Sequence, residues 1–203
     1  MAHAATSSDR HASGGHHITP VWQGIPTPKL AVWLFLASEI MFFTGLIVAY
    51  VSIRYNTPDW PSAAGLLSVP LVAFNTFLLI CSSVTMVMGY DSAERGNLRR
   101  AGMFLLATAL LGALFVGVQA YEWSELMHEG VRIDSNLFGG SFYTLTGFHG
   151  AHVAIGVIWV LAVAVKTLRG GYNHDHLGIE LAGLYWHFVD LVWIMLFTII
   201  YLI

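Results

Sequence analysis

Seven ionisable side chains lie inside, or at the ends of, apolar stretches that are long enough to cross a lipid bilayer. They are Glu39, Glu122, His149, His152, Glu180, His187 and Asp190. A charged side chain deep in hydrocarbon is costly, so such groups persist when they face a protein interior and have partners. Imidazole and carboxylate groups can bind iron or zinc, relay protons, or hydrogen-bond one another between helices.

Metal binding would need a closer set of ligands than the sequence offers. A di-iron carboxylate site in a helix bundle uses two inward-pointing Glu-x-x-His pairs, whereas the one such pair here, Glu125-Leu-Met-His128, is expected in an outer loop. His149 and His152 are three residues apart on one predicted helix, so they cannot be opposite axial ligands of one haem. We therefore predict no protein-bound metal and no catalytic residue.

Two further interpretations use the same side chains. Buried carboxylates and imidazoles can form a proton relay, although five spans with few charges make an independent pump the weaker interpretation. They can also hydrogen-bond between helices, fix helix register and hold lipid or a partner. We favour this buried polar network, whose predicted members are Glu39, Glu122, His149, His152, His187 and Asp190.

Depth along the predicted helices brings three of these residues into one layer. With a rise of about 1.5 Å per residue, Glu39 lies roughly 14 Å into the first span, and His187 and Asp190 lie roughly 13 to 18 Å into the last. Both spans are entered from the same side. The sequence therefore predicts a polar clasp between the first and last helices, with Glu180 left at the membrane surface.

The composition is that of a polytopic membrane protein. Of 203 residues, 56% are hydrophobic and 10% are charged, compared with roughly 25% charged in soluble domains. The net charge of -3 gives no reason to expect a nucleic-acid partner. We predict an all-α bundle of five transmembrane helices in one domain, residues 29–203, after a flexible His/Gly/Ser-rich tail, residues 1–28. The predicted helices span about 29–55, 66–90, 101–123, 138–168 and 178–203.

The basic residues indicate the orientation of these spans. If the N-terminus is cytoplasmic, two basic residues, Arg54 and Arg132, fall in outer loops. This asymmetry agrees with the positive-inside rule, and it places the C-terminus at the outer, periplasmic side. The inner segments then hold Arg10, Lys29, Arg95, Arg99, Arg100, Lys166 and Arg169.

Five segments, one in each predicted helix, match a known family in its own order. The chain resembles subunit III of the haem-copper respiratory oxidases, in the short five-helix bacterial form. The matching segments are Ala37-Ser-Glu-Ile-Met-Phe-Phe-Thr-Gly45, Asn75-Thr-Phe-Leu-Leu-Ile-Cys-Ser-Ser-Val-Thr85, Gln119-Ala-Tyr-Glu-Trp123, Gly140-Ser-Phe-Tyr-Thr-Leu-Thr-Gly-Phe-His-Gly-Ala-His152 and Tyr185-Trp-His-Phe-Val-Asp-Leu-Val-Trp193.

The resemblance implies a supporting subunit in a bacterial inner membrane. Such a subunit holds no haem or copper, which lie in partner subunits. It packs against subunit I, accompanies subunit II in a complex that can join a larger respiratory supercomplex, binds phospholipid, supports proton uptake, and protects the oxidase from turnover inactivation. Glu39 corresponds to the carboxylate that reacts with carbodiimides in this family.

The resemblance also implies tentative lipid contacts and leaves the electron donor open. Lys166 occupies a position where longer members have a basic residue, and we expect lipid contacts at Lys166, Arg169 and Trp186. Longer members have seven helices, so lipid contacts made by their first two do not apply here. The Ser38-Glu-Ile-Met-Phe-Phe43 segment favours cytochrome c as donor. The alternatives are a quinol oxidase subunit, an accessory subunit of a nitric oxide reductase, and a stand-alone membrane di-metal enzyme.

Overall fold

The computed structural model describes residues 25–58, 60, 61, 68–172 and 176–202, and within them the chain is helical without strands. Five helical segments are long and apolar enough to span a membrane, as the sequence predicts. The elements are α1 (Thr27–Asn56), α3 (Val69–Glu94), α4 (Leu98–His128), α5 (Leu137–Leu168), α6 (Leu177–Phe197) and the π-helical turn η1 (Thr198–Leu202), which continues α6.

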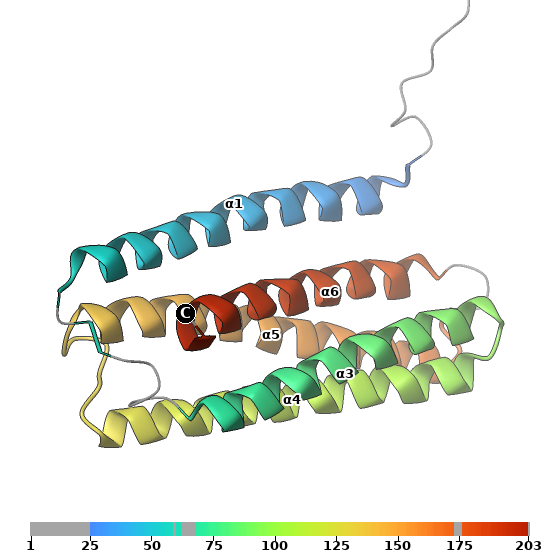
Figure 1. The fold of residues 1–203 in the computed structure, drawn as a ribbon. Helices are drawn as coiled ribbons and strands as arrows, with labels where there is room; N and C mark the ends of the chain where they lie inside the picture. Colours follow the sequence, from blue (N-terminus) through green and yellow to red (C-terminus); the bar gives the residue numbers. More distant parts are fainter. Residues whose placement is uncertain (1–24, 59, 62–67, 173–175, 203) are drawn as a thin grey trace, which may run out of the picture.

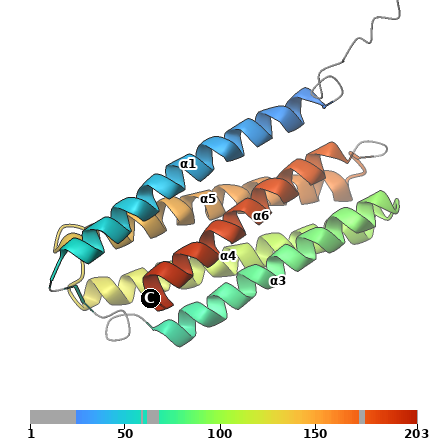
Figure 2. The same cartoon turned by 45° about the horizontal axis from the view of Figure 1, so that its top comes forward.

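Four of the helices form a closed bundle, and α1 lies along one side of it. α3 packs against α4 and α6, and α5 packs against the same two helices. α1 contacts α5 and α6, on the side of the bundle away from α4 (Figures 1 and 2). Phe43 and Tyr50 are the buried residues of α1, so most of this helix faces outward.

The helix ends follow local sequence signals. Proline lies in the first turn of α1 and of α3, where a missing backbone N–H is tolerated. Asn97 caps α4 by accepting a hydrogen bond from the backbone N–H of Arg100, and Asn136 caps α5 by accepting one from Gly139 at 2.7 Å. Such caps satisfy backbone donors that have no partner inside the helix.

The helices extend further into the polar connectors than we predicted. α3 continues to Glu94 and α4 begins at Leu98, so the charged connector after residue 90 is largely helical. The guanidinium of Arg95 pairs with Asp91 one turn earlier, at 2.9 Å, and such pairs support a solvated helix end. α4 also continues to His128, so Glu125 and His128 lie on a helix and not in a loop. Apolar length therefore underestimates helix length, because polar side chains at a helix end can be solvated.

The core is centred on tryptophans of the last helix. Trp186 is 1% exposed, and its indole Nε1 donates to Ser82 Oγ of α3 at 2.9 Å. Gly112 of α4 and Gly156 of α5 approach the same indole, leaving no room for a Cβ atom at Gly112. Trp193, fully buried, donates to Thr76 Oγ1 of α3 at 2.9 Å. α6 therefore bonds to α3 at two levels while packing against α4 and α5.

Candidate functional site

Glu39 of α1 pairs with His152 of α5 inside the membrane-spanning region. Glu39 Oε2 lies 3.2 Å from His152 Nε2, and each side chain is 16% exposed. His152 Nδ1 lies 2.7 Å from the carbonyl oxygen of Phe148, which can only accept, so Nδ1 carries a hydrogen. One proton placed between Nε2 and Oε2, on the imidazole or on the carboxyl, would make this contact a hydrogen bond. In either form the pair has no net charge, which suits an apolar environment.

His187 of α6 bonds to a different helix. Its Nδ1 lies 3.0 Å from Ser83 Oγ of α3, and the buried Asp190 lies beside both groups. The structure thus places Glu39 with His152, while His187 and Asp190 face α3. The predicted clasp between the first and last helices is corrected in this respect. Equal depth in the membrane does not specify the direction in which a side chain points, and α1 presents Glu39 to α5.

His149 is fully buried and contributes to the packing of the helices. Its Nε2 donates to the carbonyl oxygen of Val189 at 3.2 Å, so its ring is bonded to the backbone of α6. The rings of Phe115 and Trp193 lie against it, with centroids 6.0 and 4.9 Å away. Although it is one turn from His152, it belongs to a separate set of contacts.

Glu122 forms a third polar cluster, towards the other end of the bundle. Its Oε2 accepts hydrogen bonds from Gln119 Nε2 and from Tyr201 Oη, each at 2.9 Å. Gln119 and Glu122 are one turn apart on α4, so they share a face, and this spacing could have identified the pair. Tyr201 lies on η1, and apolar periodicity gives no sign of its approach to Glu122.

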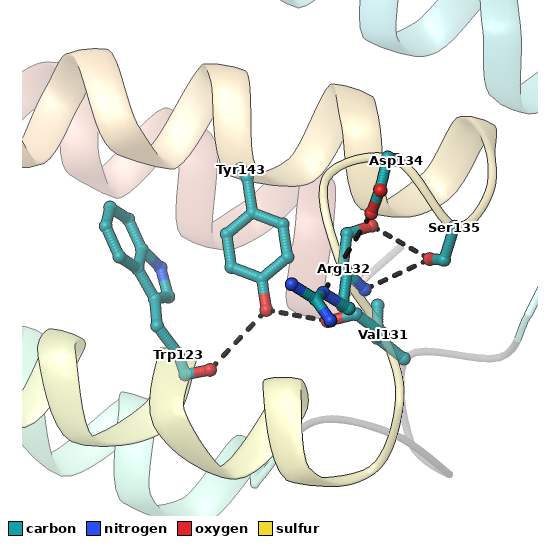
Figure 3. A network of polar contacts seen from close by, with 6 residues as sticks. All are labelled: Trp123, Val131, Arg132, Asp134, Ser135 and Tyr143. Atoms are coloured by element: carbon teal, nitrogen blue, oxygen red, sulfur yellow. Dashed lines mark hydrogen bonds and ion pairs between the residues drawn. The ribbon is translucent and has the colours of Figure 1, made fainter.

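Tyr143 of α5 holds the loop between α4 and α5, next to this cluster. Tyr143 of α5 donates to the carbonyl oxygen of Val131 at 3.0 Å and reaches that of Trp123 at 3.5 Å (Figure 3). Within the same loop, the side chains of Arg132 and Asp134 are 4.0 Å apart and exposed. The turn between α4 and α5 is therefore attached to α5 through main-chain carbonyl groups.

The opposite end of the bundle carries most of the basic side chains. Lys29 at the start of α1 forms an ion pair with Glu180 at the start of α6. Lys166 lies over the ring of Tyr172, 4.2 Å from its centroid, and Arg169 is exposed. The predicted lipid contacts of these two cations stay predictions.

Trp186 does not have such a position. Because it is buried among α3, α4 and α5, its indole cannot contact surrounding lipid, and the predicted lipid contact there is wrong. The expectation arose because tryptophan is common at membrane interfaces.

In the described part of the chain, the ionisable side chains of this region form hydrogen bonds and ion pairs, not a group of metal ligands. Within the described ranges, no group of three or more His, Cys, Asp or Glu side chains could hold a metal ion. The six predicted members of the polar network fall into separate sets: Glu39 with His152, His187 with Asp190, Glu122 with its own partners, and His149 on the backbone of α6. The histidines of the N-terminal tail lie outside the described residues.

Comparisons with known proteins agree with the motifs. The family model described as cytochrome c oxidase subunit III matches residues 7–203. Cytochrome c oxidase subunit 3 of Thermostichus vulcanus is 38% identical over 176 residues, which are 86% of this chain and 86% of that protein. The protein of the same name from Bacillus sp. (strain PS3) is 37% identical over 174 residues, 85% of this chain and 84% of the relative.

A relative of a second type is similar over a longer stretch. Quinol oxidase subunit 3 of Bacillus subtilis (strain 168) is 34% identical over 196 residues, 95% of this chain and 96% of that protein. The match of the family model to nearly the whole length agrees with the family motifs distributed over all five spans. The chain belongs to the cytochrome c oxidase subunit III family.

Proposed function

We propose that this chain is a non-catalytic subunit of a terminal haem-copper oxidase, and that it stabilises the catalytic subunit and supports its proton uptake. The observation that carries the proposal is how the intramembrane ionisable groups are bonded. Glu39 pairs with His152, and His187 and Glu122 each bond to side chains of this same chain. Groups bonded in this way stabilise a bundle and can hold protons, whereas redox chemistry needs a cofactor supplied by a partner.

The apolar outer faces are compatible with a partner inside the membrane. Large hydrophobic side chains are exposed on α1, such as Met41, and on α3, such as Phe74 and Phe77. Lipid tails or another protein's helices can cover such faces equally well. We propose oxidase subunit I as the main protein partner, together with subunit II and, in the cell, a larger respiratory supercomplex. Haem and copper then belong to those partners.

The placement of charge supports an orientation with the N-terminus in the cytoplasm of a bacterial cell and the chain in the inner membrane. Lys29, Arg95, Arg99 and Lys166 lie at the end of the bundle where α1 and α6 begin and where α3 turns into α4 (Figure 1). Cytoplasmic ends of membrane helices carry an excess of such residues. At that end we propose Lys166 and Arg169 as contacts for a phospholipid phosphate.

We propose cytochrome c as the electron donor, and quinol as the specific alternative. The two named cytochrome c oxidase relatives are slightly more identical to this chain, while the quinol oxidase relative aligns over more of it. Oxygen uptake by the purified complex decides between them. Rapid uptake with reduced cytochrome c supports the first donor, and uptake with a quinol alone supports the second.

Co-purification tests the proposed function as a whole. A tagged copy of the chain, solubilised in a mild detergent, should carry with it a haem-containing oxidase, recognised by its reduced-minus-oxidised spectrum. An unrelated tagged polytopic protein from the same cells is the control. In a strain lacking this chain, the remaining oxidase should keep its full haem and copper content. Absence of haem from the tagged preparation, or loss of a stoichiometric metal from the deleted strain's oxidase, would contradict the proposal.

A further inference from the structure

The Gln119–Glu122 pair has one completed hydrogen bond and two unused oxygen atoms. Gln119 Nε2 donates to Glu122 Oε2 at 2.9 Å, and Tyr201 Oη donates to that same oxygen. The other oxygen of each side chain, Gln119 Oε1 and Glu122 Oε1, is buried and has no partner in the described part of the chain. Both residues are only 4% exposed. Buried polar atoms are nearly always paired, so two such atoms on bonded neighbours require a joint explanation.

The unused atoms are those that a carboxylic acid would join. An acid and a primary amide can form two antiparallel hydrogen bonds, from the amide N–H to the acid carbonyl and from the acid O–H to the amide carbonyl. The first of these bonds is already present in the Gln119–Glu122 pair. The second would run between the two Oε1 atoms. It requires a hydrogen on Glu122, because an ionised carboxylate and an amide oxygen can both only accept.

We propose that Glu122 is a proton-binding site, with its proton on Oε1 and shared with Gln119 Oε1. Oε2 is then the carbonyl oxygen, and its two lone pairs accept from Gln119 and Tyr201. One proton satisfies both unused oxygen atoms at once. The carboxyl group is uncharged in this state, which is the form that a buried site in a membrane bundle favours.

The groups around Glu122 are consistent with an uncharged carboxyl. Tyr143 of α5 and Tyr201 of η1 face it, and Tyr50 of α1 lies next to Tyr201. Arg54 of α1 lies beside Tyr50 and donates to a backbone carbonyl of α6's continuation. Within the described ranges, the side chains that bond to Glu122 are neutral donors, not cations.

The Glu122 carboxyl group also connects α4 to η1, through its other oxygen, Oε2. Tyr201 reaches Glu122 from η1, a π-helical turn, and π-helical turns are frequent at functional sites. Loss of the proton would place two acceptor oxygens together and leave a negative charge in the bundle. We therefore expect both carboxyl oxygens of Glu122 to be hydrogen-bonded in the protonated form, and Oε1 to lack a partner in the ionised form.

Infrared spectroscopy of the purified complex that contains this chain tests the proposal, and the isolated full chain serves if the complex does not form. In the spectrum of the wild type minus that of Glu122→Gln at neutral pH, we expect the C=O stretch of a protonated carboxyl, shifted to lower frequency in D₂O. The variant's amide can make the same two bonds with Gln119, so the bundle should persist. Glu39→Gln is the control, and it should leave this band in place. A pair of carboxylate bands in place of the C=O stretch, or no difference, would overturn the proposal.

A second variant keeps Glu122 itself in place. Gln119→Met removes the amide acceptor, so the Glu122 C=O band should move measurably as the reciprocal bond is lost. A band that stays at its wild-type frequency would show that Glu122 shares no proton with Gln119. Because this readout follows a vibration of Glu122 itself, a failure here is distinct from a failure of the proposed oxidase role.

Discussion

The close approach of Gly112 to Trp186 predicts a measurable cost for adding one methyl group. A Cβ atom at Gly112 would lie 2.3 Å from Trp186 Cη2 and 2.9 Å from Val157 Cγ2, whereas carbon atoms pack best at about 3.5–4.0 Å. The indole has little room to retreat. Its Nε1 is bonded to Ser82, and a Cβ at Gly156 would already lie 3.0 Å from Cζ3 of the same ring. Gly112→Ala should therefore force the bundle to shift.

The expected destabilisation is about 1–3 kcal/mol, the usual cost of overpacking a core by a methylene group. Gly117→Ala is the matched control, because Gly117 is on the same helix, is exposed, and has no atom within 4 Å of a built Cβ. Both changes alter helix propensity alike, so the difference between the two variants isolates the contact. Unfolding in mixed micelles with increasing SDS, followed by circular dichroism, measures it. Equal stability of the two alanine variants would refute the packing explanation.

The remaining predictions concern the polar contacts. Glu39→Gln should abolish carbodiimide labelling of this chain while leaving its assembly intact, as mass spectrometry of labelled peptides can check; persistent labelling would assign the reactive carboxyl to another residue. His187→Leu should lower the unfolding midpoint in the same micelle titration, because it removes the partner of Ser83; an unchanged midpoint would argue against that bond. Lys29→Met should lower the free energy of unfolding by only about 0.2–1 kcal/mol, the range for a partly exposed pair such as that with Glu180. A larger coupling energy in a double-mutant cycle with Glu180→Gln would contradict this prediction.

The sequence predicts the helices well because a bilayer leaves few alternatives. A spanning segment must satisfy its backbone internally, so a long apolar stretch becomes a helix. Asn97 and Asn136 then place two helix starts by capping. The extra turns of α3 and α4 were missed because a helix can continue into the polar region, where charged side chains such as Asp91 and Arg95 are solvated.

Side-chain direction was harder to predict than depth. Glu39, His187 and Asp190 share a layer, yet Glu39 faces α5 while the other two face α3. Which faces of two helices meet depends on the packing of all five helices. In this bundle Trp186 packs against three of them, α3, α4 and α5. Its burial was not predicted, since an indole suits a membrane interface and a helix core equally well until its Ser82 partner is known.

The carbodiimide reactivity that we predict for Glu39 is compatible with its pairing with His152 inside the membrane. With Nδ1 of His152 donating to Phe148, a single proton can occupy the contact with Glu39 on either the imidazole or the carboxyl. Carbodiimides attack the protonated carboxyl, which is the form with a neutral imidazole. An ion pair and a reactive acid are therefore two positions of the same proton. The pair can remain uncharged in lipid and still keep a proton available at a side chain that is 16% exposed, which is what a role in proton uptake would require of it.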